Sequence, residues 1–221
     1  MNSSMELKRM FYAMVIPGTF IIVFWIIYIL EISLGISLST YGLSPREFKQ
    51  WYGILTFPFL HGGIEHIVSN TGSFFILGSM IFYFYNDKAL SVFIWSYFLS
   101  GIFTWIIGRS SIHIGASAMI YSFAGFLLTA GIISRNVRNL AVTLIVVFLY
   151  GSMVWGIFPQ NTNISWEGHF SGFIAGILLA IIFKSPKEIT SEDENEDDAN
   201  DNFDYTIDDE IEIKYHYKND K

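Results

Sequence analysis

The chain has 221 residues, of which 52% are hydrophobic and only 15% are charged. Soluble domains carry about 25% charged residues, so this composition argues against a water-soluble globule and for a protein embedded in a bilayer. An aromatic content of 18% excludes a chain that is disordered throughout. The sequence contains no cysteine, which excludes disulfides, thiolate metal sites, a catalytic thiol and palmitoylation.

The net charge of −7 is unevenly distributed. Residues 185–221 contain 14 acidic residues against four lysines, so residues 1–184 carry a small excess of basic residues. These bases are few and scattered, which argues against nucleic acid as a partner. The sequence therefore predicts a mildly basic membrane domain followed by a strongly acidic tail.

Six apolar stretches are each about long enough to cross a bilayer as a helix, which takes roughly 20 residues. We expect helices because backbone groups exposed to lipid must form internal hydrogen bonds. The fold class predicted is therefore all-α, a polytopic membrane protein with a bundle of six transmembrane helices. The predicted spans are residues 11–35, 64–85, 89–108, 115–134, 139–158 and 166–184.

The predicted domains are an N-terminal segment, residues 1–10, a six-helix membrane domain, residues 11–184, and the acidic tail, residues 185–221. With a cytoplasmic N-terminus, the inner connections hold seven lysine or arginine residues and the outer connections three. Basic residues are retained on the cytoplasmic side, so we expect both termini there. The long outer connection, residues 36–63, is apolar enough to pack against the bundle or lie at the membrane interface.

Strongly polar residues inside membrane spans are costly and by default indicate function. Here they gather at the outer ends of the second, fourth and sixth predicted helices, which all run in the same direction. The second helix carries His66 and Asn70, which share a face because they are four residues apart. The fourth carries Ser117 and the sixth carries His169, at a similar depth. We therefore expect these side chains to meet in one site.

The residue types fit nucleophilic catalysis. A serine hydroxyl needs a neighbouring base, usually a neutral imidazole, which makes Ser117 and His169 a candidate pair. The N–H groups of His66 and Asn70 can stabilise the oxyanion that forms when the serine attacks a carbonyl. Tyr121, one turn deeper than Ser117, can pack against the His169 ring. Because no acidic residue within these spans faces His169, the predicted catalytic group is a dyad.

Small residues in two places suit close approach of the helices. Gly168, Gly172 and Gly176 form two overlapping small-xxx-small steps, which allow the sixth helix to press onto the fourth. Gly115 and Ala116 favour a tight turn that directs backbone N–H groups near Ser117 toward the same point.

At these residues the chain resembles the rhomboid family of intramembrane serine proteases, over residues 10–184. Three motifs occur in the family's order, H-G-G-x-x-H-x-x-x-N from His61, G-x-S from Gly115 and G-H-x-x-G-x-x-x-G from Gly168. The resemblance implies a rhomboid-like six-helix bundle with a short, central serine helix. It also implies cofactor-free proteolysis of other membrane proteins in or near their transmembrane segments.

The resemblance also assigns roles by position. Ser117 corresponds to the nucleophile, His169 to the general base, and His66 and Asn70 to the oxyanion donors. Tyr121 corresponds to the residue that stacks on the base. The supporting glycines are Gly115 and Gly172, and His61 corresponds to a structural histidine.

Two features depart from the family's pattern. Ala118 stands where a glycine usually follows the nucleophile, and the Trp-Arg pair of the outer loop would fall at Tyr52 and Gly53, so that arginine is missing. A catalytically silent rhomboid-like protein that binds transmembrane clients is therefore an alternative, which Ser117 and His169 disfavour. A channel or transporter is a third class, but the spans show no charged or broken helix at the midplane.

Further expectations concern residues around the site and in the tail. We expect Glu65 and Glu167 to be solvated charges at the mouth of the pocket, and His113 to be structural or interfacial. The acidic tail is predicted to be disordered. Alternating apolar residues near its end indicate a strand for a partner protein, with Ile211, Ile213, Tyr215 and Tyr217 on one side. The minimal six-span form resembles the bacterial branch of the family, which implies a bacterial plasma membrane as the location.

Overall fold

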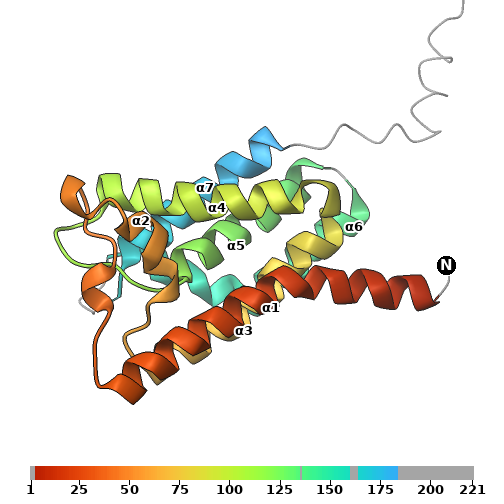
Figure 1. The fold of residues 1–221 in the computed structure, drawn as a ribbon. Coiled ribbons are helices and arrows are strands. Elements are labelled where there is room, and N and C mark those ends of the chain that lie inside the picture. Colours follow the sequence, from red (N-terminus) through yellow and green to blue (C-terminus); the bar gives the residue numbers. More distant parts are fainter. Residues whose placement is uncertain (1–2, 135, 160–163, 184–221) are drawn as a thin grey trace, which may run out of the picture. The chain divides into compact units, whose positions relative to one another are not determined.

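The computed structural model describes residues 3–134, 136–159 and 164–183, and within these ranges the chain is largely helical (Figure 1). The predicted acidic tail lies outside the described residues. The principal helices follow the six predicted spans in order: α1 (Ser3–Leu34), α3 (Ile64–Phe84), α4 (Asn86–Ile107), α5 (Ser117–Ile133), α6 (Val137–Tyr150) and α7 (Trp166–Ile182). The all-α membrane fold expected from the sequence is thereby confirmed.

The helices differ in how far they can cross a membrane. Among the described residues, α1, α3, α4 and the stretch Val137–Ile157 are long and apolar enough to span a bilayer. The other two, α5 and α7, are apolar but have only 17 residues each, a rise of about 25 Å against roughly 30 Å of hydrocarbon. The count of six complete spans therefore stays a prediction.

Two predicted spans differ most from the structure. Helix α1 begins at Ser3 rather than at residue 11, because its polar first turns continue the helix beyond the apolar stretch. The predicted span 139–158 changes at Gly151 from α6 into a 3-10 helix, η4 (Gly151–Ile157). Hydropathy reports only the apolar character of these segments and is insensitive to both details.

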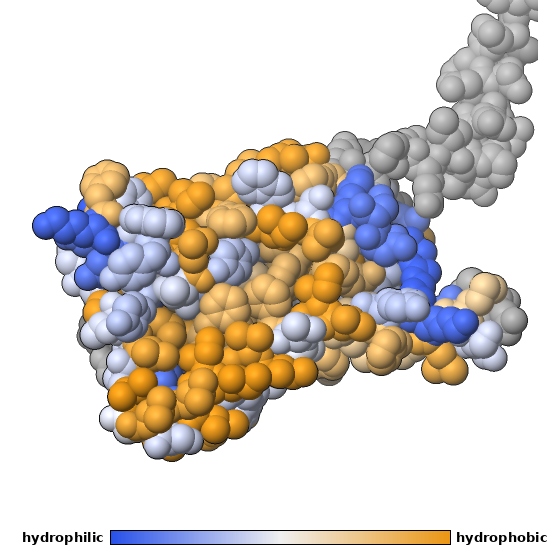
Figure 2. Space-filling view, viewed as in Figure 1, coloured by the Kyte–Doolittle hydropathy of each residue, from blue (hydrophilic) through white to orange (hydrophobic). Residues whose placement is uncertain are grey.

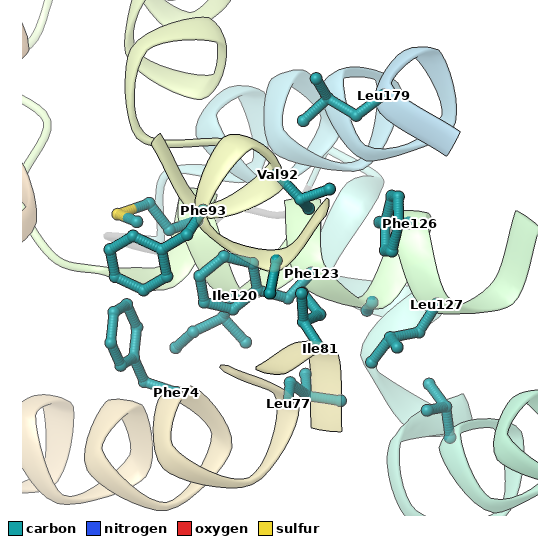
Figure 3. Close-up of a cluster of buried hydrophobic side chains, with 14 of the residues drawn as sticks. Phe74, Leu77, Ile81, Val92, Phe93, Ile120, Phe123, Phe126, Leu127 and Leu179 are labelled. Atoms are coloured by element: carbon teal, nitrogen blue, oxygen red, sulfur yellow. The ribbon is translucent and has the colours of Figure 1, made fainter. Parts of the chain in front are cut away.

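Helix α5 forms the centre of the bundle. Its residues from Ala118 to Leu127 are all buried, and its side chains pack between those of α3, α4 and α7 (Figure 3). Phe123 of α5 contacts Phe74 of α3 and Phe93 of α4, with ring centroids 5.3 and 5.5 Å apart. The serine helix is therefore short and surrounded by protein, as the family resemblance implies.

Helices α3, α5 and α7 run in the same direction. Successive residues of α5 and α7 meet in the same order, with Gly172 against Ala118 and Gly176 against Ser122. Helix α3 follows α5 likewise, because Asn70 lies beside Gly115 just before α5, and Phe74 contacts Phe123 two turns later. The first turns of these three helices consequently lie at one end of the bundle, which we call the site end.

Glycines set the spacing between α5 and α7. A Cβ added at Gly176 would lie 2.7 Å from the backbone N of Phe126, and one at Gly125 would lie 2.6 Å from the carbonyl O of Phe173. Real Cβ atoms do not approach backbone this closely, so only glycine fits. The small residues therefore bring the two backbones into direct contact, as expected for small-xxx-small packing.

The connection between α1 and α3 packs against α4. It contains three 3-10 turns and one short helix: η1 (Ser39–Tyr41), η2 (Phe48–Gln50), α2 (Gly53–Thr56) and η3 (Phe57–Phe59). The Tyr97 hydroxyl of α4 donates a hydrogen bond to the carbonyl of Leu55 in α2. Ile54 and Phe57 lie against Gly101 of α4. The expectation that this connection packs on the bundle is confirmed.

Arg46 ties the same connection to the end of α4. Its Nη1 donates to the carbonyl oxygens of Ile106, at 3.0 Å, and Gly108, at 2.8 Å. The cation thus caps carbonyl groups at a helix C-terminus, where the helix dipole favours positive charge. An arginine outside the family's Trp-Arg position therefore anchors this loop.

The surface divides into apolar sides and polar ends. Orange residues cover the visible sides of α1 and α3, while blue residues gather toward the two ends of the bundle (Figure 2). Large hydrophobic side chains along α1 are exposed, including Phe11, Ile22 and Ile29. A band of this kind suits contact with lipid chains.

We expect Gly176→Ala to destabilise the bundle. The added methyl meets the backbone of Ser122 and Phe126, and overpacking of this kind costs about 1–3 kcal/mol. The matched control is Gly72→Ala, because that exposed glycine of α3 has open space around its Cβ position. Thermal unfolding in detergent measures both, and equal Tm values would contradict the packing described here.

Candidate active site

The turn before α5 places two donor nitrogens beside the start of the serine helix. Gly115 has φ +105°, a backbone conformation that residues with a side chain rarely adopt. Its N–H donates a hydrogen bond to the carbonyl of Phe57 at 2.8 Å. A Cβ at Gly115 would lie 2.5 Å from His66 Nε2 and 3.2 Å from Asn70 Nδ2. Both side chains of α3 thus face the backbone two residues before Ser117.

Asn70 has an unused donor. Its side chain is buried, and Nδ2 has no hydrogen-bond partner within the described part of the chain. Buried amide groups are normally hydrogen-bonded, so an orphaned donor calls for an explanation. A group that forms only during a reaction, such as an oxyanion, supplies one.

The His169 ring is held by a ring contact and a hydrogen bond. It stacks on Tyr121, with centroids 4.2 Å apart and planes 12° apart, as expected from the sequence. Its Nδ1 lies 3.0 Å from the carbonyl O of Gly156 in η4, and the Tyr121 hydroxyl donates to the carbonyl of Met153 at 2.7 Å. Since a carbonyl only accepts, Nδ1 carries the proton in the neutral ring, and Nε2 is left as the acceptor.

Gly156 is a site residue that the sequence did not reveal. Its carbonyl orients His169, and a Cβ at this position would run into the Tyr121 hydroxyl and lie 3.1 Å from His169 Nδ1. No motif could have identified it, because every residue has a carbonyl. The weak signal was a glycine in the segment that leads toward His169.

Ser117 is the first residue of α5 and is half-buried, as are His66 and His169. Tyr121, one turn further along α5, carries the ring on which His169 stacks. Ala118, the next residue, is packed against Gly172, one turn beyond His169 in α7. Ser117 and His169 therefore occupy the first turns of two adjoining parallel helices at the site end.

Glu167 corrects an expectation. It is only 4% exposed rather than solvated, and its Oε1 lies 3.5 Å from Arg109 Nε. Arg109 also donates from Nη2 to the carbonyl of Ile164 at 2.9 Å. The position two residues before His169 suggested a charge at an open mouth, but the loop between α4 and α5 supplies a cation, Arg109, to the buried carboxylate. Glu65, by contrast, is exposed as expected.

His113 links the loop before α5 to the start of α7. It is buried, its Nδ1 lies 2.5 Å from Ser165 Oγ, and its Nε2 lies 3.2 Å from the carbonyl O of Arg109. Ser165 is the N-cap of α7 and accepts from the N–H of Gly168 at 3.2 Å. The structural role expected for His113 is thus to hold the cap of the helix that carries His169.

Comparison with known proteins shows to which family the chain belongs. The rhomboid domain matches residues 48–186, a range that contains α3 to α7 and every site residue described above. The chain belongs to the rhomboid family.

Relatives are found in bacteria and plants. The rhomboid chain is 30% identical over 182 residues to the uncharacterized protein Rv1337 of Mycobacterium tuberculosis, covering 76% of this chain and 74% of the relative. It is 25% identical over 140 residues to rhomboid protease GluP of Bacillus subtilis, covering 62% of this chain and 27% of GluP. With RHOMBOID-like protein 7 of Arabidopsis thaliana it shares 23% identity over 138 residues, 60% of this chain and 44% of the relative.

His61 lies just before α3 of this rhomboid protein and is 4% exposed. Its ring contacts Phe24 and meets the ring of His66 edge-on, with centroids 5.1 Å apart. Burial, reinforced by the charge of His66, lowers the pKa of His61 from 6.5 to about 4. His61 is therefore neutral in the fold at neutral pH.

We expect the protein to lose stability as the pH falls from 6.5 toward 4. The lowered pKa of His61 means that the unfolded chain binds a proton in this window that the folded chain excludes. Thermal unfolding in detergent across this pH range measures the effect, and His61→Gln is expected to flatten the slope. An unchanged slope in the variant would show that other groups control the acid sensitivity.

Proposed function

We propose that this protein is an intramembrane serine endopeptidase that cleaves transmembrane proteins in or near their membrane segments, with Ser117 as nucleophile and His169 as general base. The observation that carries the proposal is the fixed orientation of His169. Its ring is stacked on Tyr121 and bonded through Nδ1 to Gly156, which keeps Nε2 free to accept a proton beside the helix that begins at Ser117. Membership of a family that includes a relative named as a protease supports the same activity.

The proposed reaction proceeds in two steps. His169 Nε2 takes the proton of the Ser117 hydroxyl as Oγ attacks the carbonyl carbon of the scissile peptide bond. The tetrahedral intermediate collapses, the C–N bond breaks, and His169 returns the proton to the departing amine. Water then attacks the acyl-enzyme with the same base, which releases the new carboxylate and restores Ser117.

The oxyanion of each tetrahedral intermediate needs donors that are already in place. His66 and Asn70 face the turn that precedes Ser117, and the unpartnered Nδ2 of Asn70 is suited to this role. The N-terminal end of α5 adds a favourable dipole for negative charge. Gly115 and Gly172 support the site because side chains there would displace the donors or separate α5 from α7.

The catalytically silent alternative depends on the missing loop arginine and on Ala118. This residue is buried in the packed face of α5, with its carbonyl against Gly172. Its side chain belongs to a small buried cluster with Leu43 and Phe57. The structure gives no reason for Ala118 to remove the proposed activity.

We further propose a bacterial plasma membrane as the location, with both termini cytoplasmic and the site end outside. The excess of basic residues on the inner connections supports this orientation. We also propose, from the sequence alone, that the predicted strand near the end of the tail binds a partner protein. Transmembrane proteins and the lipid bilayer are the proposed partners of the membrane domain.

Labelling of the purified protein by a serine-directed fluorophosphonate tests the proposed function. We expect the parent to be labelled, and Ser117→Ala and His169→Ala to be unlabelled, because the reagent requires an activated serine hydroxyl. Ser79→Ala is the control, since that serine, whose hydroxyl is buried, lies on α3 away from the site end and is expected to label like the parent. No labelling of a folded parent that still binds transmembrane clients would support the silent alternative.

We expect Gly156→Ala to lower kcat/KM on a model transmembrane substrate by about 10²-fold, the cost of misplacing a catalytic group by about 1 Å. The methyl displaces the Tyr121 hydroxyl and crowds His169 Nδ1. Gly151→Ala in the same 3-10 helix is the matched control, because its nearest neighbour would be 4.0 Å away. A kcat/KM of Gly156→Ala within twofold of that of Gly151→Ala would contradict the role of η4 in orienting His169.

A further inference from the structure

A groove lies at the end of the bundle opposite the site end, where α1 begins and α3 passes into α4. Its volume is about 440 Å³. Polar side chains of Lys8, Arg9 and Asn86 line it together with the apolar or aromatic side chains of Met5, Tyr12 and Phe82. A groove lined by both cationic and apolar groups suits an amphipathic anion.

The guanidinium of Arg9 is held in a fixed position beside this groove. Its Nη2 donates to the carbonyl of Tyr83 at 2.8 Å, and its Cζ lies 4.8 Å from the centroid of the Tyr83 ring. The Tyr83 hydroxyl in turn donates to Glu6 at 2.8 Å, which fixes the ring. The carbonyl and the ring of Tyr83, which are both neutral, therefore hold the positively charged guanidinium of Arg9 in place.

Within the described part of the chain, neither cation of the groove forms an ion pair. Over the described ranges, neither Lys8 nor Arg9 has a carboxylate oxygen within 4 Å, and Arg9 Nε is buried without a hydrogen-bond partner. The nearby acids are Glu6, whose carboxylate accepts from Tyr83, and Asp87 in the first turn of α4. Two neighbouring cations without a carboxylate partner are suited to bind an anion.

The groove lies at the boundary between lipid and water. The apolar stretch of α1 starts at residue 11, two residues after Arg9, and the Phe11 side chain is exposed. Figure 2 shows hydrophilic residues gathered at this end, next to the apolar sides of the bundle. This is the depth at which phospholipid headgroups lie.

We propose that this groove binds the phosphate headgroup of an anionic phospholipid. Lys8 and Arg9 contact the phosphate oxygens. Asn86 reaches the polar part of the headgroup, while Met5, Tyr12 and Phe82 contact the glycerol and the first methylenes of the chains. Basic pockets between membrane helices are known to hold anionic headgroups for these physical reasons.

Native mass spectrometry of the full-length protein in detergent tests the proposal, with phosphatidylglycerol and phosphatidylcholine as the two probes. We expect phosphatidylglycerol to remain bound and phosphatidylcholine to bind much more weakly. Lys8→Gln and Arg9→Gln are each expected to weaken phosphatidylglycerol binding by about fivefold. The control is Lys49→Gln, which removes the same charge from an exposed residue of the α1–α3 connection at the site end and is expected to bind like the parent.

Each alternative outcome is decisive. Equal binding of the two lipids, or equal binding by the parent and Lys8→Gln, would overturn the proposal. Displacement of phosphatidylglycerol by inorganic phosphate or glycerol phosphate at millimolar concentration would assign the groove to a free phosphate instead. Because Arg9 also contacts Tyr83, its variant is compared only where its Tm matches that of the parent; Lys8 makes no hydrogen bond to the described protein and keeps the test valid.

Discussion

The direct contact between the backbones of α5 and α7 is the constraint on which the rest of the structure depends. Gly172 and Gly176 allow α7 to lie against Ala118 and Ser122 of α5, and the parallel order of these contacts fixes the register. That register brings the His169 ring onto Tyr121, one turn from Ser117. A larger side chain at either glycine would separate the proposed nucleophile from its base, although both reactive groups would remain chemically unchanged.

The site end is organised by loops around this helix pair. Arg46 fastens the α1–α3 connection to the last carbonyls of α4. In the same connection, the carbonyl of Phe57 accepts a hydrogen bond from the N–H of Gly115. His113 and Ser165 join the loop before α5 to the cap of α7. The two helices are therefore held at their first turns by hydrogen bonds and along their length by close packing.

Much of this arrangement could be predicted from the sequence because it rests on periodic or local signals. Apolar length located the helices, and the four-residue spacing of His66 and Asn70 put them on one face. The Gly-x-x-x-Gly steps predicted the α5–α7 contact. These features depend on side chains whose chemistry can be read one residue at a time.

The features that were missed depend on contacts between distant segments. Glu167 was expected in water, but burial is decided by the loop that carries Arg109, which the local sequence of α7 does not describe. The loop anchor at Arg46 was not foreseen because its partners are backbone carbonyls about 60 residues away. Gly156 acts on His169 through its backbone, which no pattern of side chains records.

The use of a main-chain carbonyl to orient His169 has a consequence for how this protein tolerates change. A carboxylate in the same place would add a formal charge close to the hydrocarbon, whereas a peptide oxygen brings only a dipole that is already present in the chain. The acceptor cannot be deleted by exchanging a side chain, so mutational scanning registers only the steric demand at Gly156. Converting the following amide to an ester would instead weaken the acceptor itself while leaving every side chain intact.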